Sequence, residues 1–240
     1  MNPIPTWKPL CRVGAIAGLI AALLFRRNIG AEVSLFTGLE AIPTNAAEWY
    51  SLLQSNPFIA LSLLAFFDLV NYLLVGAIFL ALAAAFWQVN KSATALALAS
   101  GLVGVTLNLA SNISLTMLSL SQRYAVATLA AQRTDLLAAG QTVLAGNDPL
   151  AAIPGTVALV SLLLVALAGL LFSLLLLPSH RGTAILGLLA SGCDLAYCLA
   201  FPLTLLAPVY MLLAAAGLFW MLWHLLVARV LWQYAKEGTI

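Results

Sequence analysis

Charge is what this sequence has least of. Only 8 % of its 240 residues are charged, whereas about a quarter is usual in soluble domains. The ten Lys and Arg residues form no basic cluster, which excludes a nucleic-acid-binding surface and any nucleic-acid partner. Hydrophobic residues make up 63 % of the chain, and this composition is that of a membrane protein.

Cysteine, histidine and catalytic motifs are also scarce. Cys11, Cys193 and Cys198 have no metal-binding spacing, and we interpret them as small buried apolar residues. The chain has two histidines and contains no metalloprotease, serine-hydrolase or phosphate-loop motif. The glycines that surround an intramembrane aspartyl pair are missing around Asp68 and Asp194. We therefore expect no cofactor, no metal and no enzyme activity.

Long apolar runs are what the sequence has in place of charge. A bilayer core of about 30 Å needs about 20 helical residues, and six runs bounded by polar residues meet this length. The sequence therefore predicts an all-α integral membrane helix bundle with six transmembrane helices, in a single membrane domain over residues 1–240. The expected spans are approximately 10–28, 57–87, 93–121, 153–177, 183–205 and 207–231, with tight turns at 90–92 and 179–182.

Basic residues predict the direction of these spans, because cytoplasmic loops carry an excess of Lys and Arg. With both termini in the cytoplasm, the inside receives Lys8, Arg12, Lys91, Arg181, Arg229 and Lys236. The outside receives Arg26, Arg27, Arg123 and Arg133. We therefore predict an N-in, C-in topology in the cytoplasmic (inner) membrane.

Residues 121–149, between the third and fourth spans, repeat apolar side chains at three- and four-residue spacing. This pattern predicts an amphipathic helix, or a helix pair, on the membrane surface. Gln132, Arg133 and Gln141 lie on its polar side. They either cap the bundle from outside or belong to a solvated connector.

Two aspartates stand inside the apolar runs. If the second span enters the bilayer near Pro57, Asp68 lies eleven residues deeper, and Asp194 lies eleven residues beyond Thr183. Both carboxyl groups would then be about 16 Å deep, near the midplane. The segments DLVNY and DLAYC that they begin would occupy equivalent places in an inverted repeat of two three-span halves.

Polar side chains on three spans are candidates to surround these acids. The third span carries Asn108 and Asn112 on one helix face. The predicted binding site is formed by Asp68, Asn71, Tyr72, Asn108, Asn112, Asp194 and Tyr197. An intramembrane carboxyl group marks either such a site or hydrogen bonds that only hold the spans together.

Small residues and aromatic residues mark helix contacts and helix ends. Gly14 with Gly18, and Gly169 with Ser173, form small-x-x-x-small steps, which are typical of helix packing within a bundle. Trp220, Trp223, His224, Trp232 and Tyr234 cluster near the end of the last span. We interpret this second group as an interfacial aromatic belt.

One stretch, SLSQRYAVATLAAQRTDLLAAGQTVLA at 119–145, resembles the outer loop of an uncharacterised family of bacterial six-span membrane proteins, a domain of unknown function. The matching positions are Tyr124, Ala125, Ala127, Thr128, Gln132, Arg133, Leu137, Ala138, Ala139, Gly140 and Gln141, after LASN at 109–112. Arg123 departs from the small or acidic residue expected there. The resemblance implies the six-span fold and a bacterial inner-membrane location, and it implies no catalytic residues.

Two functional hypotheses follow. The first is a small-solute or proton-linked transport or binding protein with a polar site at the midplane. The alternative is a non-catalytic accessory or scaffolding subunit of a larger membrane complex. The expected partners are accordingly the lipid bilayer, a small solute or a proton, and other membrane subunits or further copies of the chain.

Overall fold

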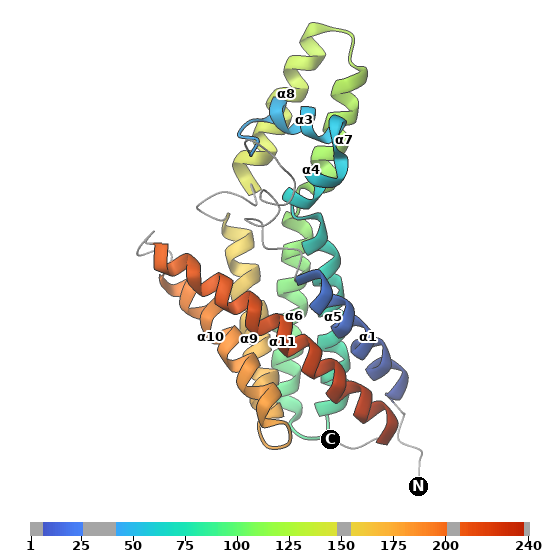
Figure 1. Cartoon of the computed structure of the whole chain (residues 1–240), viewed down its shortest axis with the longest axis vertical. Coiled ribbons are helices and arrows are strands. Elements are labelled where there is room, and N and C mark those ends of the chain that lie inside the picture. Colours follow the sequence, from blue (N-terminus) through green and yellow to red (C-terminus); the bar gives the residue numbers. More distant parts are fainter. Residues whose placement is uncertain (1–6, 26–41, 148–154, 201–206, 238–240) are drawn as a thin grey trace. The chain divides into compact units, whose positions relative to one another are not determined.

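The structure is a computed structural model that describes residues 7–25, 42–147, 155–200 and 207–237 (Figure 1). The described residues form α-helices joined by short connections, with no strand among them. Arg26 and Arg27, and the ends of several expected spans, lie outside the described residues. The all-α prediction is confirmed for the part that the structure describes.

Five described segments are long and apolar enough to cross a membrane. Two connections between their helices are short, at 87–90 and at 177–180, as the sequence predicts. The five segments are helix α5 (Phe66–Phe86), α6 (Lys91–Ser111) running into α7 (Ser114–Val126), α9 (Thr156–Leu176), α10 (Arg181–Ala200) and residues Met211–Glu237 of α11 (Ala207–Glu237).

The expected first span is helix α1 (Lys8–Phe25), which has 18 residues and is not among the five. It packs along α11 (Figure 1). A Cβ added at Gly14 would overlap Ala81, and one at Gly18 would stand 3.0 Å from the carbonyl oxygen of His224. The two glycines therefore serve helix packing, as their spacing predicts. The six-span count stays a prediction.

The expected second span is not one continuous helix. Helix α4 (Pro57–Leu63) ends before Leu64, and α5 begins at Phe66. Between them Ala65 has a φ of 60°, a left-handed conformation that non-glycine residues seldom adopt. The continuous helix over 57–87 is therefore wrong, and Asp68 lies in the first turn of α5.

The expected third span is longer than a bilayer needs. Helices α6 and α7 together cover Lys91–Val126, with a break at 112–113. The 36 residues exceed the roughly 20 helical residues that a hydrocarbon core of about 30 Å needs. Helix α6 alone, with 21 residues, is long enough to cross.

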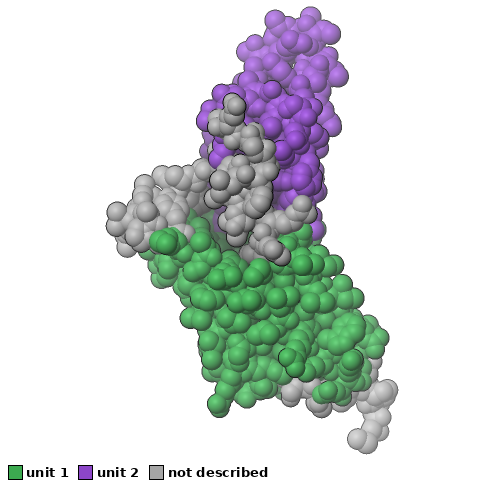
Figure 2. Space-filling view, viewed as in Figure 1, with its two compact units in different colours: residues 1–26, 71–108, 159–240 green, residues 27–70, 109–158 purple. Residues whose placement is uncertain are grey.

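The chain gathers into two compact units (Figure 2). Unit 1 comprises 1–26, 71–108 and 159–240, and unit 2 comprises 27–70 and 109–158. In unit 1, α5 packs on α9 through the stacked rings of Phe79 and Phe172, whose centroids are 5.5 Å apart. The Ser161 hydroxyl on α9 donates to the Gly104 carbonyl on α6 over 2.8 Å.

Unit 2 has a hydrophobic core of its own, formed by α3 (Ala46–Ser55), α4, α7 and α8 (Ala130–Asn147). Helix α8 confirms the predicted helix between the third and fourth spans. Its apolar side chains Leu136, Leu137, Val143 and Leu144 pack into this core. The prediction that this face rests on the membrane surface is therefore wrong, because α3 and α7 cover it.

Candidate functional site

The buried carboxyl group of Asp194 joins α10 to α11 within unit 1. Asp194 is 3 % exposed, and the indole Nε1–H of Trp220 donates to its Oδ2 over 2.7 Å. A carboxyl group removed from water is costly unless it is neutral or hydrogen-bonded. The Trp220 indole therefore supplies the partner that keeps this acid inside the helix bundle.

Two further rings of α11, those of Trp223 and His224, lie beside the Trp220 ring that makes this bond. Trp223 lies edge-on to Trp220 and to His224, with centroid distances of 5.0 and 5.3 Å. The His224 Nδ1 stands 2.7 Å from the Trp220 carbonyl oxygen. A carbonyl oxygen only accepts, so Nδ1 carries the hydrogen, and the neutral ring then has Nε2 as its acceptor.

The burial of these rings corrects the interfacial-belt interpretation. Trp220, Trp223 and His224 are buried inside the bundle, where a belt at the membrane surface would leave them accessible. Trp232 is 42 % exposed, which fits that interpretation. The outer Trp232 behaves as the sequence predicts, Tyr234 is half-buried, and the inner rings belong to the polar interior.

Helices α9 and α10 each contribute a Gly-x-x-x-Ser step, and the two steps face each other. A Cβ added at Gly187 on α10 would overlap the Ser173 hydroxyl on α9 and Trp223 Nε1. A Cβ added at Gly169 on α9 would stand 2.8 Å from the Ser191 Oγ on α10 and would overlap the Trp220 ring. Each glycine thus leaves space for one serine and one tryptophan. We call Ser173, Ser191, Asp194, Trp220, Trp223 and His224 the Asp194 cluster.

Three polar atoms of the Asp194 cluster are buried and have no hydrogen-bond partner among the described residues. They are the Ser173 Oγ, the Ser191 Oγ and the Trp223 Nε1. Native proteins bury few such atoms, because each forgoes a hydrogen bond it had in water. The overlap at Gly169 and Gly187 leaves no space there for a solute of several atoms. The arrangement therefore suits a proton or a water-sized guest.

Two further predicted site residues bury their side chains near these helices. Tyr197 packs against Leu159 and Leu162 of α9. Asn71 of α5 is 2 % exposed, and its Oδ1 has no hydrogen-bond partner among the described residues. Both residues belong to unit 1, as do the half-buried Tyr72 and Asn108.

Asn112 has a structural role that the structure explains fully. Its Nδ2 donates to the Ala65 carbonyl over 2.8 Å, and its Oδ1 accepts from the N–H of Ser114 over 3.1 Å. The first bond adds a donor to a carbonyl at the break between α4 and α5 that also accepts from the Asp68 N–H over 3.2 Å, and the second gives the first N–H of α7 an acceptor. Asn112 therefore holds together two helix breaks within unit 2.

Asp68 also lies in unit 2. Its position in the first turn of α5 places a carboxyl group near the positive end of the helix dipole, which stabilises negative charge. The equal depth predicted for Asp68 and Asp194 requires a continuous helix from Pro57, and the break at Ala65 removes that premise. A single site shared by both acids stays a prediction.

Sequence reasoning missed most of the Asp194 cluster. The overlooked signal is the pair of equal steps, Gly169 with Ser173 and Gly187 with Ser191, which marks two helices able to approach closely. No sequence pattern indicates that Trp220, 26 positions after Asp194, supplies the donor.

Comparison with protein-family models, with curated proteins and with solved structures finds no match to this chain.

Proposed function

We propose that the chain is a multi-pass membrane protein that binds or moves protons, linked to a small solute, through the Asp194 cluster. The observation that supports this is a buried acid among three further buried polar atoms that have no hydrogen-bond partner among the described residues. Ionisable side chains inside membrane-spanning segments mark proton and ion pathways by default. Hydrogen bonds that only held the helices together would leave no buried polar atom without a partner.

We propose a proton rather than a larger solute at the Asp194 cluster because the side chains pack closely there. Trp220 and Trp223 fill the space in front of Gly169 and Gly187, so the cluster has no cavity for an organic molecule at these contacts. A carboxyl group can accept and release a proton without any such space. The solute of a proton-linked transporter would then bind elsewhere along the same helices.

We also propose six spans with both termini in the cytoplasm of a bacterial cell, and unit 2 outside the bilayer. Helix α1 is the sixth span, supported by its close approach to α11 at Gly18. The short α5–α6 and α9–α10 connections carry Lys91 and Arg181, in agreement with the excess of positive charge expected inside. The bacterial inner membrane is the location that the resemblance of residues 119–145 implies.

Proton entry into proteoliposomes that contain a pH-sensitive dye tests the proposal. Asp194→Asn keeps an oxygen that accepts from Trp220 but cannot ionise, so we expect it to abolish proton entry while thermal unfolding stays close to that of the wild type. Asp135→Asn makes the same chemical change at an exposed site on α8 and should leave proton entry unchanged.

The topology is tested separately in a chain without its native cysteines. A thiol reagent that cannot cross the membrane labels Ser92→Cys or Thr128→Cys only from the side on which that residue lies.

Unchanged proton entry in Asp194→Asn would reject the proposal and assign the cluster to helix packing. The alternative function, an accessory or scaffolding subunit, would then take its place. It requires a partner protein that co-purifies at a fixed ratio after gentle extraction. Labelling of Ser92→Cys from outside the cell would reverse the proposed topology without affecting the role of Asp194.

A further inference from the structure

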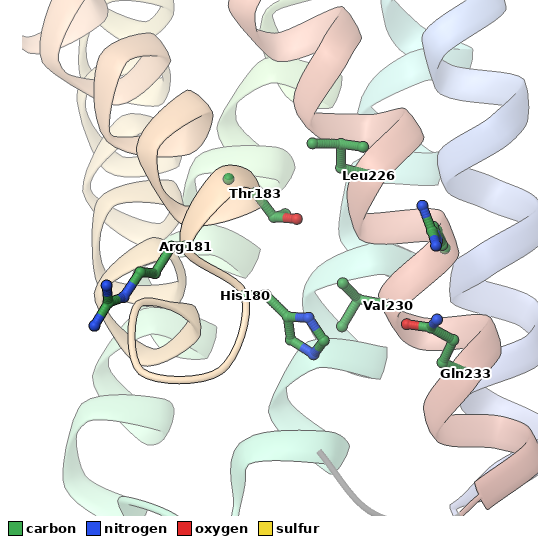
Figure 3. A pocket seen from close by; sticks show the side chains of 8 residues that line it. His180, Arg181, Thr183, Leu226, Val230 and Gln233 are labelled. Carbon is green, nitrogen blue, oxygen red and sulfur yellow. The ribbon is translucent and has the colours of Figure 1, made fainter.

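An open cavity lies in unit 1 between the start of α10 and the last third of α11, and no residue of the Asp194 cluster lines it (Figure 3). Its volume is about 400 Å³, within the range of about 300–1,000 Å³ that is usual for small-ligand sites. Its polar lining comes from His180, Arg181, Thr183, Arg229 and Gln233. None of these residues belongs to the binding site that the sequence predicts.

The charges that line the cavity are all of one sign. Arg181 and Arg229 keep their positive charge at every relevant pH, and no Asp or Glu lines the cavity. Thr183 is buried at the wall, and Gln233 adds an amide to the same side as Arg229. Two guanidinium groups without a carboxylate partner in the lining favour an anion, and phosphate suits their planar donors best.

The start of α10 adds backbone donors. The first N–H groups of a helix have no acceptor within it, and Gly182, the second residue of α10, lines the cavity. A Cβ added at Gly182 would meet no atom within 4 Å, so the backbone is open to a ligand there. Helix starts of this kind stabilise phosphate oxygens through both hydrogen bonds and the helix dipole.

The remaining wall is apolar. Leu226 and Val230 stand one turn apart on α11, and Leu222 and Leu225 on the same helix are exposed. Arg181 is the first residue of a helix long and apolar enough to span a membrane, so in the topology proposed above the cavity would lie where a lipid head group meets the acyl chains. Basic pockets between helices at this level are typical sites for acidic lipids.

We propose that this cavity binds a phosphate ester, as the head group of an anionic phospholipid or as a soluble phosphate ester. Arg229 is the principal contact, assisted by Thr183, Gln233 and the α10 backbone. The His180 ring occupies the space between the two helices, whereas the exposed Arg181 side chain extends away from α11 (Figure 3). Arg181 therefore has to rotate toward the ligand, and Arg229 is the residue to test.

Native mass spectrometry of the full chain tests the proposal with phosphatidylglycerol, phosphatidylcholine and glycerol 3-phosphate as separate probes. We expect Arg229→Gln to weaken phosphatidylglycerol retention about tenfold, as loss of one charge-assisted contact of about 1.4 kcal/mol would. Lys91→Gln removes an equal charge from the exposed start of α6 and should retain the lipid as the wild type does. Both side chains are exposed, so both variants should fold.

The probes separate the two sources of phosphate. Selective retention of phosphatidylglycerol over phosphatidylcholine, lost in Arg229→Gln, supports a lipid site. Binding of glycerol 3-phosphate alone, lost in the same variant, supports a soluble phosphate ester. Equal weakening by Lys91→Gln, or unchanged binding of every probe by Arg229→Gln, would overturn the proposal.

Discussion

Unit 1 and unit 2 are both helical and both bury large side chains, but unit 1 adds a series of close glycine contacts between its helices. The core of unit 2 contains Trp49, Tyr50 and Met117, and unit 1 buries Phe79, Phe172 and Trp223 as fully. In unit 1, Gly14, Gly101 and Gly187 also stand against a neighbouring helix, whereas in unit 2 Gly140 stands against Tyr50. Small residues let helices approach closely where lipid removes the hydrophobic driving force.

The two units also treat polar groups differently. In unit 2 the Tyr50 hydroxyl donates to the Leu136 carbonyl over 2.8 Å, and the Ser121 hydroxyl donates to the Tyr50 carbonyl over 3.3 Å. Asn71, Ser173, Ser191 and Trp223 keep buried polar atoms without a hydrogen-bond partner, and all four lie in unit 1. The described residues of unit 2 contain no such atom. A function that needs an uncommitted polar group is therefore to be sought in unit 1.

Their surfaces complete the contrast. Helix α1 of unit 1 exposes Val13, Ile16, Leu19 and Leu23. Helix α8 of unit 2 exposes polar side chains instead, at 132–135 and 141–142. Lipid tolerates the surface of α1 and water that of α8, whereas unit 2 also exposes Phe58, Val126 and Leu129, so the contrast holds between these two helices.

Unit 2 also explains the stretch at 119–145. Arg133 stands over the Tyr124 ring at 5.8 Å and donates to the Ala127 carbonyl over 3.0 Å. The Gln141 Oε1 accepts from the N–H of Ala46 at the start of α3 over 3.2 Å. These contacts of Arg133 and Gln141 lie within unit 2, and the two interpretations, cap of the bundle or solvated connector, stay predictions.

Among the substitutions that test this difference between the two units, the largest loss of stability is expected at Gly140 in unit 2. A Cβ there would overlap the Tyr50 hydroxyl, whose ring is fully buried and cannot move aside. Gly140→Val should lower the free energy of unfolding of unit 2 by about 3 kcal/mol, at the upper end for overpacking. Hydrogen exchange of α3 and α8 amides in nanodiscs should then be about a hundredfold faster.

Gly146→Val is the matched control, because a Cβ at Gly146 of the same helix meets no atom within 4 Å. It should change stability by no more than about 0.5 kcal/mol, as surface substitutions usually do. Equal exchange rates in the two variants would show that Tyr50 does not pack against α8.

A smaller effect is expected from serine hydroxyls that the two units bury equally. Ser121→Ala removes the bond to Tyr50 in unit 2 and should cost about 1 kcal/mol. Ser173→Ala removes a unit 1 hydroxyl that has no hydrogen-bond partner among the described residues, so it should leave stability unchanged or raised. Hydrogen exchange of the amides around each site measures both. Equal losses would mean that the two units satisfy their polar groups alike.

The smallest effect is expected at the exposed start of α3. The N–H of Thr44 and the side-chain amide of Asn45 donate to the Glu48 carboxylate, each over 2.7 Å, and lower the pKa of Glu48 below its usual 4.5. A lowered pKa in the folded state stabilises the fold above about pH 4.5, and this contribution disappears as the pH falls through the folded value.

NMR of a selectively labelled Thr44 amide in the full chain measures this titration. The amide shift should change below pH 4.5 in the wild type and should stay constant in Glu48→Gln, which cannot ionise. A midpoint at or above 4.5 would mean that these hydrogen bonds do not persist in solution.

Some of the architecture could be predicted from particular residues. The apolar runs at 66–86 and 156–176 are long enough to read directly as membrane-spanning helices. The break at Ala65 could not be read in this way, because Leu64 and Ala65 are neither proline nor glycine and carry no turn signal. The Asn112 side chain, 47 positions away, donates to the Ala65 carbonyl at this break, in addition to the Asp68 N–H.

An all-helical membrane protein could be predicted from the residues alone, because composition and the length of apolar runs are local properties that the bilayer selects directly. The set of polar residues that act together depends on how the helices pack. Asp194 meets Trp220 of the next helix, and Gly187 admits Ser173 and Trp223, because helix packing brings together side chains that no periodicity of a single segment relates.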